Sequence, residues 1–131
     1  MDFAFRLERA ADLRESIEQY CDEHQISAGC IISCVGCVYQ VSLRMVGGEI
    51  FKTYKKDFEI VSLTGTVSKN GCHLHISLSD ADGTTIGGHL CAGTLVNTTA
   101  EIVIHSLDEK YLFTRELDDK TGWKELIIKE K

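Results

Sequence analysis

The sequence of 131 residues contains no proline, and none of its stretches approaches the run of about 20 apolar residues that a membrane-spanning helix needs. A secretory signal is also lacking, because Asp2 stands where basic residues are required and no sustained apolar run follows. No linker or low-complexity segment divides the chain, and its length suits one domain. We therefore expect a single domain over residues 1–131, without a membrane segment and located in the cytoplasm.

Positive charge is scarce, since 14 Lys and Arg stand against 20 Asp and Glu, for a net charge of −6. A chain with this balance repels polyanions unless its cations are segregated, so general binding to duplex DNA is disfavoured. The clearest basic cluster combines Lys52, Lys55 and Lys56 with Phe51 and Tyr54, and it can contact phosphate or stack on a base. A solvated loop or strand end is the plainer interpretation.

Six cysteines are present, but a chain of this length has enough core to fold without disulfides, so we expect reduced thiols. Cys34 and Cys37 form a C-x-x-C pattern, yet the strand-like Val38–Leu43 follows where a redox site would open a helix. We interpret the pair as a turn between strands. Cys91 shares strand parity with His89 and lies about 7 Å along the strand from it, which makes it a secondary candidate for a metal ligand.

One helix is predicted, from Asp12 to Gln25, because Asp12 can cap its first turn and Leu13, Ile17 and Cys21 form an apolar stripe at helical spacing. Elsewhere apolar residues alternate with polar ones, starting with Phe3, Phe5 and Leu7, which is typical of half-buried strands. After that opening strand we expect strands at Gly29–Val35, Val38–Met45, Glu49–Tyr54, Phe58–Val67, His73–Leu78, Thr85–Cys91, Thr98–Ser106, Tyr111–Glu116 and Glu125–Lys129. The fold class is α+β, mostly antiparallel sheet in a barrel-like or two-layer arrangement.

Three histidines carry the strongest chemical signal. His73 and His75 are two residues apart in a predicted strand, so both side chains project on one face while Leu74 projects on the other. A turn at Asp82-Gly83 returns the chain, and His89 can then lie beside the first two. Three imidazoles with one open coordination position can hold a divalent transition metal, with zinc as the first choice. Polar histidines on a solvated face are the alternative.

The same stretches resemble a known family. Phe58–Gly65, His73-x-His75, Gly87-Gly88-His89 and Thr99–Ile104 are similar to the prokaryotic single-domain form of the plants-and-prokaryotes-conserved (PPC) domain, which in plants follows AT-hook DNA-binding motifs. The resemblance implies an antiparallel α+β domain that is usually a homotrimer. A more distant likeness, to acetolactate decarboxylases and a group of ester hydrolases, implies zinc on a His-x-His pair and a third histidine. The Arg-Gly-Arg-Pro hook of the plant proteins is missing, so their DNA affinity does not carry over.

Two glutamates are candidates for proton transfer near such a metal. Glu101 projects opposite the apolar face formed by its neighbours in Thr99–Ile104, and Glu59 sits in a strongly apolar strand. A carboxylate among apolar neighbours has a raised pKa unless it is paired, which suits a general acid or base. A hydrogen bond at a trimer interface, or an ion pair with an arginine such as Arg6, explains both residues equally well.

Three functions therefore stay open. The first is a homotrimeric metal-binding module with a small-molecule ligand or a regulatory role. The second is a metal-dependent hydrolase or decarboxylase that uses Glu101 or Glu59. The third is a DNA-associated regulatory domain, as the plant relatives suggest.

Overall fold

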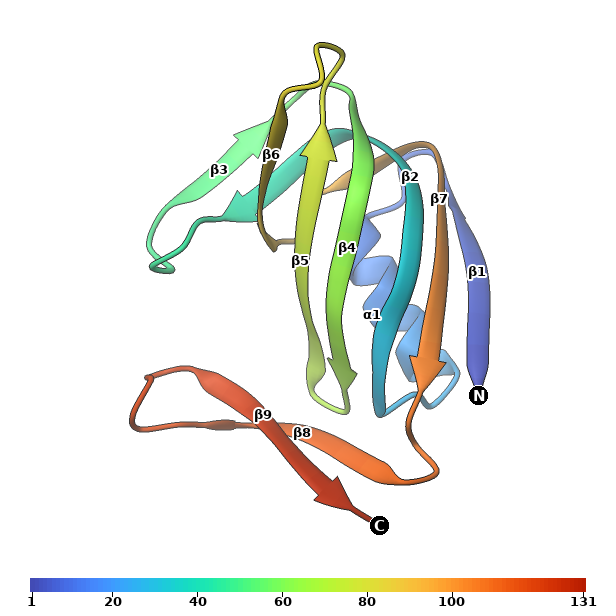
Figure 1. The fold of residues 1–131 in the computed structure, drawn as a ribbon, viewed down its shortest axis with the longest axis vertical. Helices are drawn as coiled ribbons and strands as arrows, with labels where there is room; N and C mark the ends of the chain where they lie inside the picture. The colour runs from blue at the N-terminus through green and yellow to red at the C-terminus, as the bar shows by residue number, and fades with distance from the viewer.

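The computed structural model describes residues 1–131 and contains one helix, packed against a large antiparallel sheet, and a separate two-stranded antiparallel sheet (Figure 1). The strands are β1 (Asp2–Glu8), β2 (Ala28–Arg44), β3 (Phe51–Tyr54), β4 (Phe58–Ser68), β5 (Gly71–Ser79), β6 (Thr85–Leu90), β7 (Leu95–Ser106), β8 (Tyr111–Leu117) and β9 (Lys124–Glu130), and the helix α1 spans Leu13–Glu23. The predicted α+β class with mostly antiparallel strands is confirmed. The helix lacks the length and apolar character that a membrane crossing requires.

The large sheet bends until it partly closes on itself. Its strand order is β1-β7-β2-β4-β5-β6, and β6 pairs again with the end of β2 through Leu43 with Leu90 and Arg44 with His89. The strands β2, β4, β5 and β6 thus form a ring, while β1, β7 and β3 lie outside it, so the sheet is not a closed barrel (Figure 1). This ring closure brings the far end of β2 beside the hairpin of β5 and β6.

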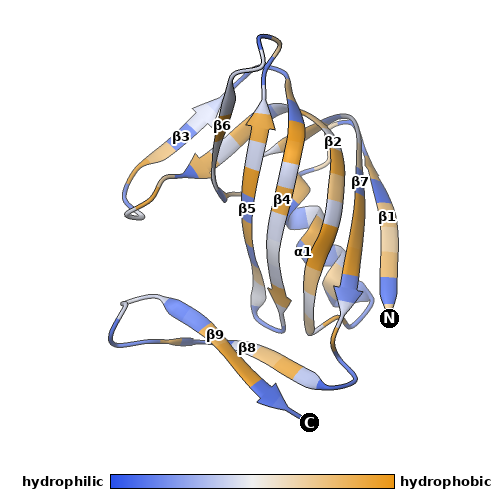
Figure 2. Ribbon diagram, viewed as in Figure 1, coloured by the Kyte–Doolittle hydropathy of each residue, from blue (hydrophilic) through white to orange (hydrophobic).

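The helix begins where the sequence predicts, because the Asp12 side chain accepts a hydrogen bond from the Glu15 backbone N–H. Leu13, Ile17 and Cys21 are buried and cover the inner face of the sheet, where alternate strand residues complete a single apolar core (Figure 2). The core therefore lies between α1 and the sheet, and polar side chains of the strands project on the opposite, outer face.

The sequence-based prediction was wrong for the C-x-x-C pattern. Cys34 and Cys37 lie inside one continuous 17-residue strand, β2, where two strands joined by a turn were expected. Gly36 has a φ of 152°, and a Cβ there would lie 2.0 Å from the Thr99 carbonyl oxygen. Gly36 thus allows the backbones of β7 and β2 to come close at a point where their register shifts. The chain does not turn there.

The last two strands form a separate hairpin at one end of the large sheet (Figure 1). Phe113 of β8 is buried, and its backbone carbonyl accepts a hydrogen bond from the Lys69 N–H at the β4–β5 turn. At the tip of this hairpin Trp123 rests on Gly48 in the β2–β3 turn, where an added Cβ would lie 2.6 Å from the indole ring. The hairpin thereby reaches across one side of β5 and β6.

Candidate metal centre

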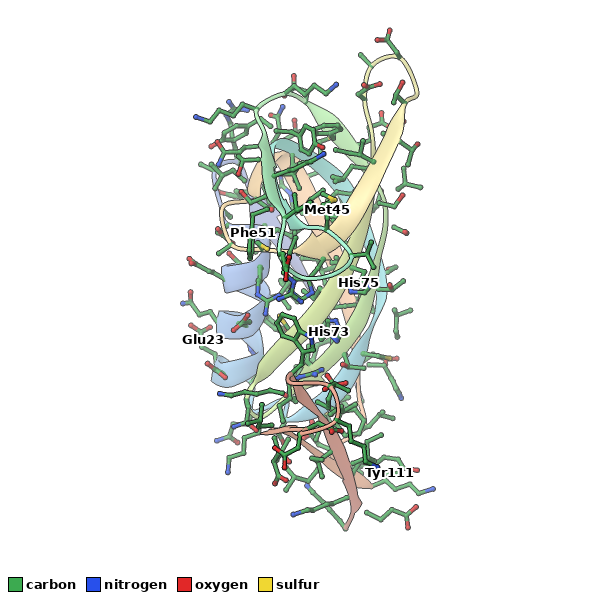
Figure 3. The ribbon with its side chains drawn as sticks, turned by 90° about the vertical axis from the view of Figure 1, so that its left-hand side faces the viewer. Glu23, Met45, Phe51, His73, His75 and Tyr111 are labelled. Atoms are coloured by element: carbon green, nitrogen blue, oxygen red, sulfur yellow. The ribbon has the colours of Figure 1, made fainter.

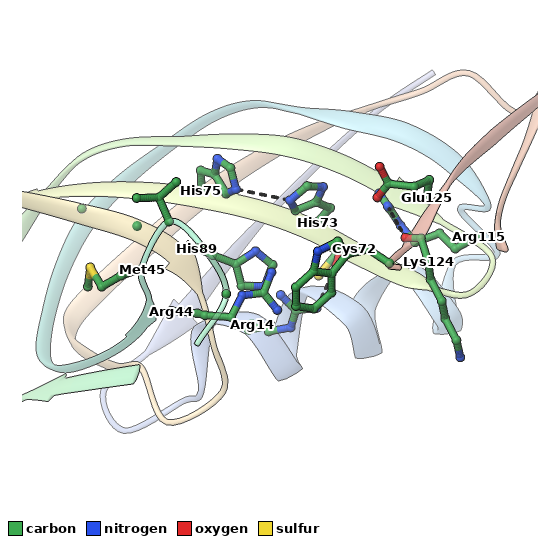
Figure 4. A pocket seen from close by; sticks show the side chains of 16 residues that line it. Arg14, Arg44, Met45, Cys72, His73, His75, His89, Arg115, Lys124 and Glu125 are labelled. Carbon is green, nitrogen blue, oxygen red and sulfur yellow. Dashed lines mark hydrogen bonds between the residues drawn. The ribbon is translucent and has the colours of Figure 1, made fainter. Parts of the chain in front are cut away.

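The strand β5 presents His73 and His75 as the alternation predicts. Both are exposed, whereas Cys72, Leu74 and Ile76 are buried in the core. Figure 3 shows the two histidines along β5, between the β2–β3 hairpin and the C-terminal hairpin. Their Nε2 atoms are 3.2 Å apart (Figure 4). Two nitrogens bound to one tetrahedral zinc, each at about 2.0 to 2.1 Å, lie about 3.3 to 3.4 Å apart, so this spacing suits a shared ion.

The third histidine arrives through β6. His89 is the direct cross-strand partner of His75, and its ring centroid lies 5.3 Å from that of His73 and 5.7 Å from that of His75. One ring nitrogen from each of the three residues lies within 4.8 Å of the others. Moreover, His89 Nδ1 is buried and has no hydrogen-bond partner in the chain. The three imidazoles therefore fit the donor set of a divalent transition metal.

Two glycines let β6 take this position. A Cβ at Gly87 would lie 2.6 Å from the Ile76 carbonyl oxygen, and one at Gly88 would lie 3.1 Å from the Arg44 carbonyl oxygen. Any larger residue at Gly87 would push β6 away from β5 and carry His89 with it. A close approach of the backbones is thus the reason for the Gly-Gly pair before His89.

The histidines line a cavity of about 890 Å³ whose other charged residues are mostly cationic (Figure 4). The charged lining residues are Arg14 from α1, Arg44 from β2, Arg115 from β8, and Lys124 and Glu125 from β9. Trp123 completes the wall, and the Arg44 guanidinium lies 4.7 Å from the centre of its ring. Such contacts between a guanidinium and an indole are favourable.

This environment favours the neutral form of His73 and His89. Burial, followed by the charges of Arg44 and Arg14, lowers the pKa of His89 to about 4. The pKa of His73 is lowered as well, by burial and then by Arg115. A neutral imidazole is the form that binds a metal, because the ligand nitrogen must carry its lone pair.

The two glutamates predicted from the sequence lie elsewhere in the chain. Glu59 and Glu101 are exposed on the outer face, and neither lines the cavity. Glu59 pairs with Ser79, which is four residues or about 13 Å along β5 from His75. Glu101 lies on β7, three strands or about 14 Å from β5, and it pairs with Arg6 and Val35. Within one chain, the two glutamates therefore lie too far from the histidines to exchange a proton at a metal bound there. Their role in proton transfer stays a prediction.

The secondary candidates also lie outside the cavity. Lys52 is in β3, and Lys56 forms an ion pair of 2.9 Å with Asp80. Cys91 follows β6, and its thiol donates to the His89 carbonyl oxygen at 3.7 Å. The cysteine that does line the cavity is Cys72, and burial raises the pKa of its thiol to about 12. It is therefore a protonated thiol at neutral pH.

Comparison with known proteins identifies the family. The model of the Plants and Prokaryotes Conserved domain matches residues 1–108. The chain belongs to this family. At 37% identity over 128 residues it is also similar to a protein of Synechococcus sp. called bifunctional protein GlmU, and the match covers 98% of the chain but only 20% of that relative. The Arabidopsis thaliana AT-hook motif nuclear-localized protein 10 is 33% identical over 90 residues, which are 60% of the chain and 25% of that protein.

Solved structures of this fold agree with the chain over almost its full length. A protein of Salmonella enterica is 33% identical with a TM-score of 0.95, covering 100% of the chain and 94% of its own. A protein of Archaeoglobus fulgidus described as metal-containing is 28% identical with a TM-score of 0.82, covering 97% of the chain and 93% of its own. The C-terminal hairpin, which lies beyond the family match, is thus included in both structural matches.

Proposed function

We propose that the protein is a homotrimeric metal-binding module in which His73, His75 and His89 hold a divalent transition metal, with zinc as the first choice. The observation that carries this proposal is the convergence of three ring nitrogens within 4.8 Å, two of them at the spacing expected for ligands of one ion. The unpartnered, buried Nδ1 of His89 gives independent support, since a bound ion would fix the orientation of that ring. The description of the Archaeoglobus relative as metal-containing points the same way.

The trimer is supported by the outer face of the large sheet. Ile32, Val35 and Val61 are 55%, 59% and 58% exposed on this face, which α1 does not cover. Exposed apolar side chains gathered on one sheet face are typical of an interaction surface. Glu101 is the register partner of Val35, so its position suits the alternative of an interface hydrogen bond. We infer that copies of the chain pack through this face.

A role in catalysis is the second candidate, favoured by the three-histidine donor set. Such a site leaves one coordination position open, and a bound zinc ion there polarises a carbonyl group or lowers the pKa of a water to about 7. Within the chain, Glu125 is the carboxylate that lines the cavity, so it is the candidate for proton exchange there. Hydrolysis or decarboxylation is the chemistry that these groups would serve.

A DNA-associated role is suggested by the names of the plant relative and of two solved structures of the same fold. The AT-hook protein shares 33% identity with 60% of the chain, but the chain carries a net charge of −6 and no proline-containing hook. We expect the isolated protein to leave duplex DNA unshifted in a mobility assay even at low salt, where electrostatic binding is strongest.

Metal content tests the main proposal. The purified protein is loaded with zinc, desalted and examined by elemental analysis. We expect one zinc per chain in the unmodified protein and a loss of bound zinc in His73→Ala, His75→Ala and His89→Ala. The matched control is His24→Ala, which removes an exposed histidine at the end of α1 that packs on Phe3 of β1, a strand separated from β5 by three others. Unchanged zinc content in all three site variants would reject the metal centre.

A further inference from the structure

We propose that the cavity beside the three histidines binds a small molecule through an oxyanion, a carboxylate or phosphate group, which Arg44 and Arg115 hold next to the metal position. This inference deepens the proposed function and rests on it, because the metal ion contributes part of the positive charge that the anion meets. It names the class of ligand that the family resemblance leaves open.

Arg44 is placed beside the histidines by the ring closure of the sheet. It is the register partner of His89, which is in turn the partner of His75, so the three residues form one row across β2, β6 and β5. Directly opposed side chains of neighbouring strands lie about 5 Å apart at their Cβ atoms. The guanidinium takes part in none of the three ion pairs of the chain and instead rests on the Trp123 ring. Its charge is thus unneutralised within the chain.

Arg115 flanks the other side of the cluster. One terminal nitrogen donates to Thr66 Oγ1 at 3.1 Å, and Thr66 is the register partner of His73. The other donates to the Lys124 carbonyl oxygen at 3.4 Å, while Nε is buried without a partner. The side chain is therefore held beside His73, and the second N–H of each terminal nitrogen and the full positive charge remain available. No carboxylate pairs with it.

Arg14 also lines the cavity, but its nitrogens are already engaged within the chain. Its terminal nitrogens donate to the Leu90 and Cys72 carbonyl oxygens, each at 2.8 Å, and its Nε pairs with Glu18 at 3.0 Å. All three nitrogens are engaged, and the charge has a counterion. Arg14 ties α1 to β5 and β6, so its role is to support the cavity wall.

The charge of the cavity is the opposite of that of the chain. Arg44, Arg115 and Lys124 line it together with one carboxylate, Glu125, in a protein whose net charge is −6. Histidine ligands carry no negative charge, so they do not offset the charge of a divalent ion. An anionic ligand therefore gains from the ion and from both guanidiniums at once, whereas a neutral or cationic one does not.

The shape of the donors and the size of the cavity further limit the classes of ligand that fit. A guanidinium presents a planar fork of N–H donors that matches carboxylate and phosphate oxygens. The volume of about 890 Å³ falls in the range of about 300 to 1,000 Å³ that is usual for small-molecule sites. A small organic acid or phosphate compound fits both conditions.

Calorimetry with zinc-loaded protein at low ionic strength tests the inference. The probes are malonate, inorganic phosphate and malonamide, the last being the uncharged counterpart of malonate. Fluorescence gives a second readout, because Trp123 is the only tryptophan of the chain and lies in the cavity wall beside Arg44. Arg44→Gln and Arg115→Gln remove the two donors. Arg9→Gln is the charge-matched control, since Arg9 lies outside the cavity and contacts Tyr39 and Asn97.

We expect malonate or phosphate to bind and to change the fluorescence, and malonamide to do neither. Each site variant should weaken anion binding about tenfold or more, as the loss of a charged hydrogen bond does, while Arg9→Gln leaves it unchanged. Metal-free protein should bind the anions more weakly. Binding of malonate indicates a carboxylate ligand, and binding of phosphate indicates a phosphate compound.

The two proposals fail in different ways. Protein that retains no zinc in elemental analysis contradicts the metal centre itself. Three results with protein that retains zinc would overturn the anion site alone. The first is that the protein binds malonamide as well as it binds malonate, and the second is that it binds no anion. The third result is equal anion binding by Arg44→Gln, Arg115→Gln and Arg9→Gln. Arg115→Lys keeps the positive charge but lacks the planar pair of donors, and it replaces Arg115→Gln if that variant does not fold. It should bind anions more weakly than the unmodified protein.

Discussion

At the scale of single residues, two kinds of polar group stand out. Some buried atoms have no hydrogen-bond partner in the chain, and one carboxylate has several. His89 Nδ1 and Arg115 Nε are buried without partners, both at the edge of the histidine cavity. Such orphaned groups cost stability, and a bound ion or water that supplies the missing partner is one explanation for them. Asp108 shows the opposite arrangement. Its carboxylate accepts hydrogen bonds from the Ser27 backbone N–H and from the hydroxyls of Ser27 and Ser106, at 2.6 to 2.9 Å.

Asp108 yields a prediction about stability and pH. Burial opposes its ionisation, but the hydrogen bonds from Ser106 and Ser27 outweigh burial and hold the pKa of Asp108 below its usual value. The stabilisation is therefore complete at pH values above about 4, the usual pKa of an aspartate, and is lost as the pH falls through the lower, folded-state pKa. Asp108→Asn should lower the free energy of unfolding at pH 7 by about 1 to 3 kcal/mol.

Urea denaturation at several pH values checks this effect. The difference between Asp108→Asn and the unmodified protein should shrink as the pH falls below about 4, because both then carry a neutral side chain. The control is Asp119→Asn, an exposed residue in the β8–β9 turn for which we expect no measurable change. A difference that stays constant down to pH 2 would contradict the role of the charge.

At the scale of elements, the short strand β6 decides whether a site exists. It lies between β5 and the end of β2, and it aligns His89 with His75 on one side and with Arg44 on the other. The backbones come close enough only because Gly87 and Gly88 have no Cβ. The position of the third histidine thus depends on two residues that contact no ligand themselves.

Gly87→Ala should therefore weaken zinc binding about tenfold or more while leaving the fold intact. The added Cβ would lie 2.6 Å from the Ile76 carbonyl oxygen, so β6 must shift and His89 must leave its place beside His75. Competition with a chromophoric zinc chelator measures the affinity. Thr85→Ala, an exposed change in the same strand, is the control and should bind zinc normally. Equal affinities for both variants would show that the placement of β6 is not limiting.

At the scale of the whole molecule, the outer face of the large sheet carries both His73 and His75 and an exposed apolar patch. α1 covers the inner face, and the apolar residues Ile32, Val35 and Val61 stay exposed on the other. Fully burying an exposed side chain of this kind gains about 1.5 to 3 kcal/mol, so burying the remaining exposed half of each gains roughly half of that, and a closed symmetric assembly repeats this gain at every interface. This arithmetic favours association through the outer face.

Val35→Glu should convert the proposed trimer to a monomer, since each copy would place a carboxylate beside Glu101 in an apolar interface. Light scattering coupled to size-exclusion chromatography gives the mass directly. The control is Ile50→Glu, which alters a similarly exposed apolar residue, 58% exposed, between the β2–β3 turn and β3. A trimer that survives Val35→Glu, or a monomeric unmodified protein, would contradict the interface.

The sequence predicted much of the fold because strand alternation is a local property. It placed α1 and its cap, and it placed His73 and His75 on the face opposite Leu74. It failed at Cys34 and Cys37, where Gly36 suggested a turn but allows a close contact between strands. The close contact involves Thr99, more than sixty positions away in the chain, so no local pattern could have revealed it.

What the sequence determined by itself is the family, the antiparallel α+β class and the pairing of two histidines on one strand face, because all three follow from short-range patterns. Only the tertiary structure decided that Arg44 and Arg115 stand beside those histidines and that Glu59 and Glu101 do not. The reason is physical. The arginines come from β2 and β8, and only the ring closure of the sheet and the docking of the C-terminal hairpin bring them to one cavity.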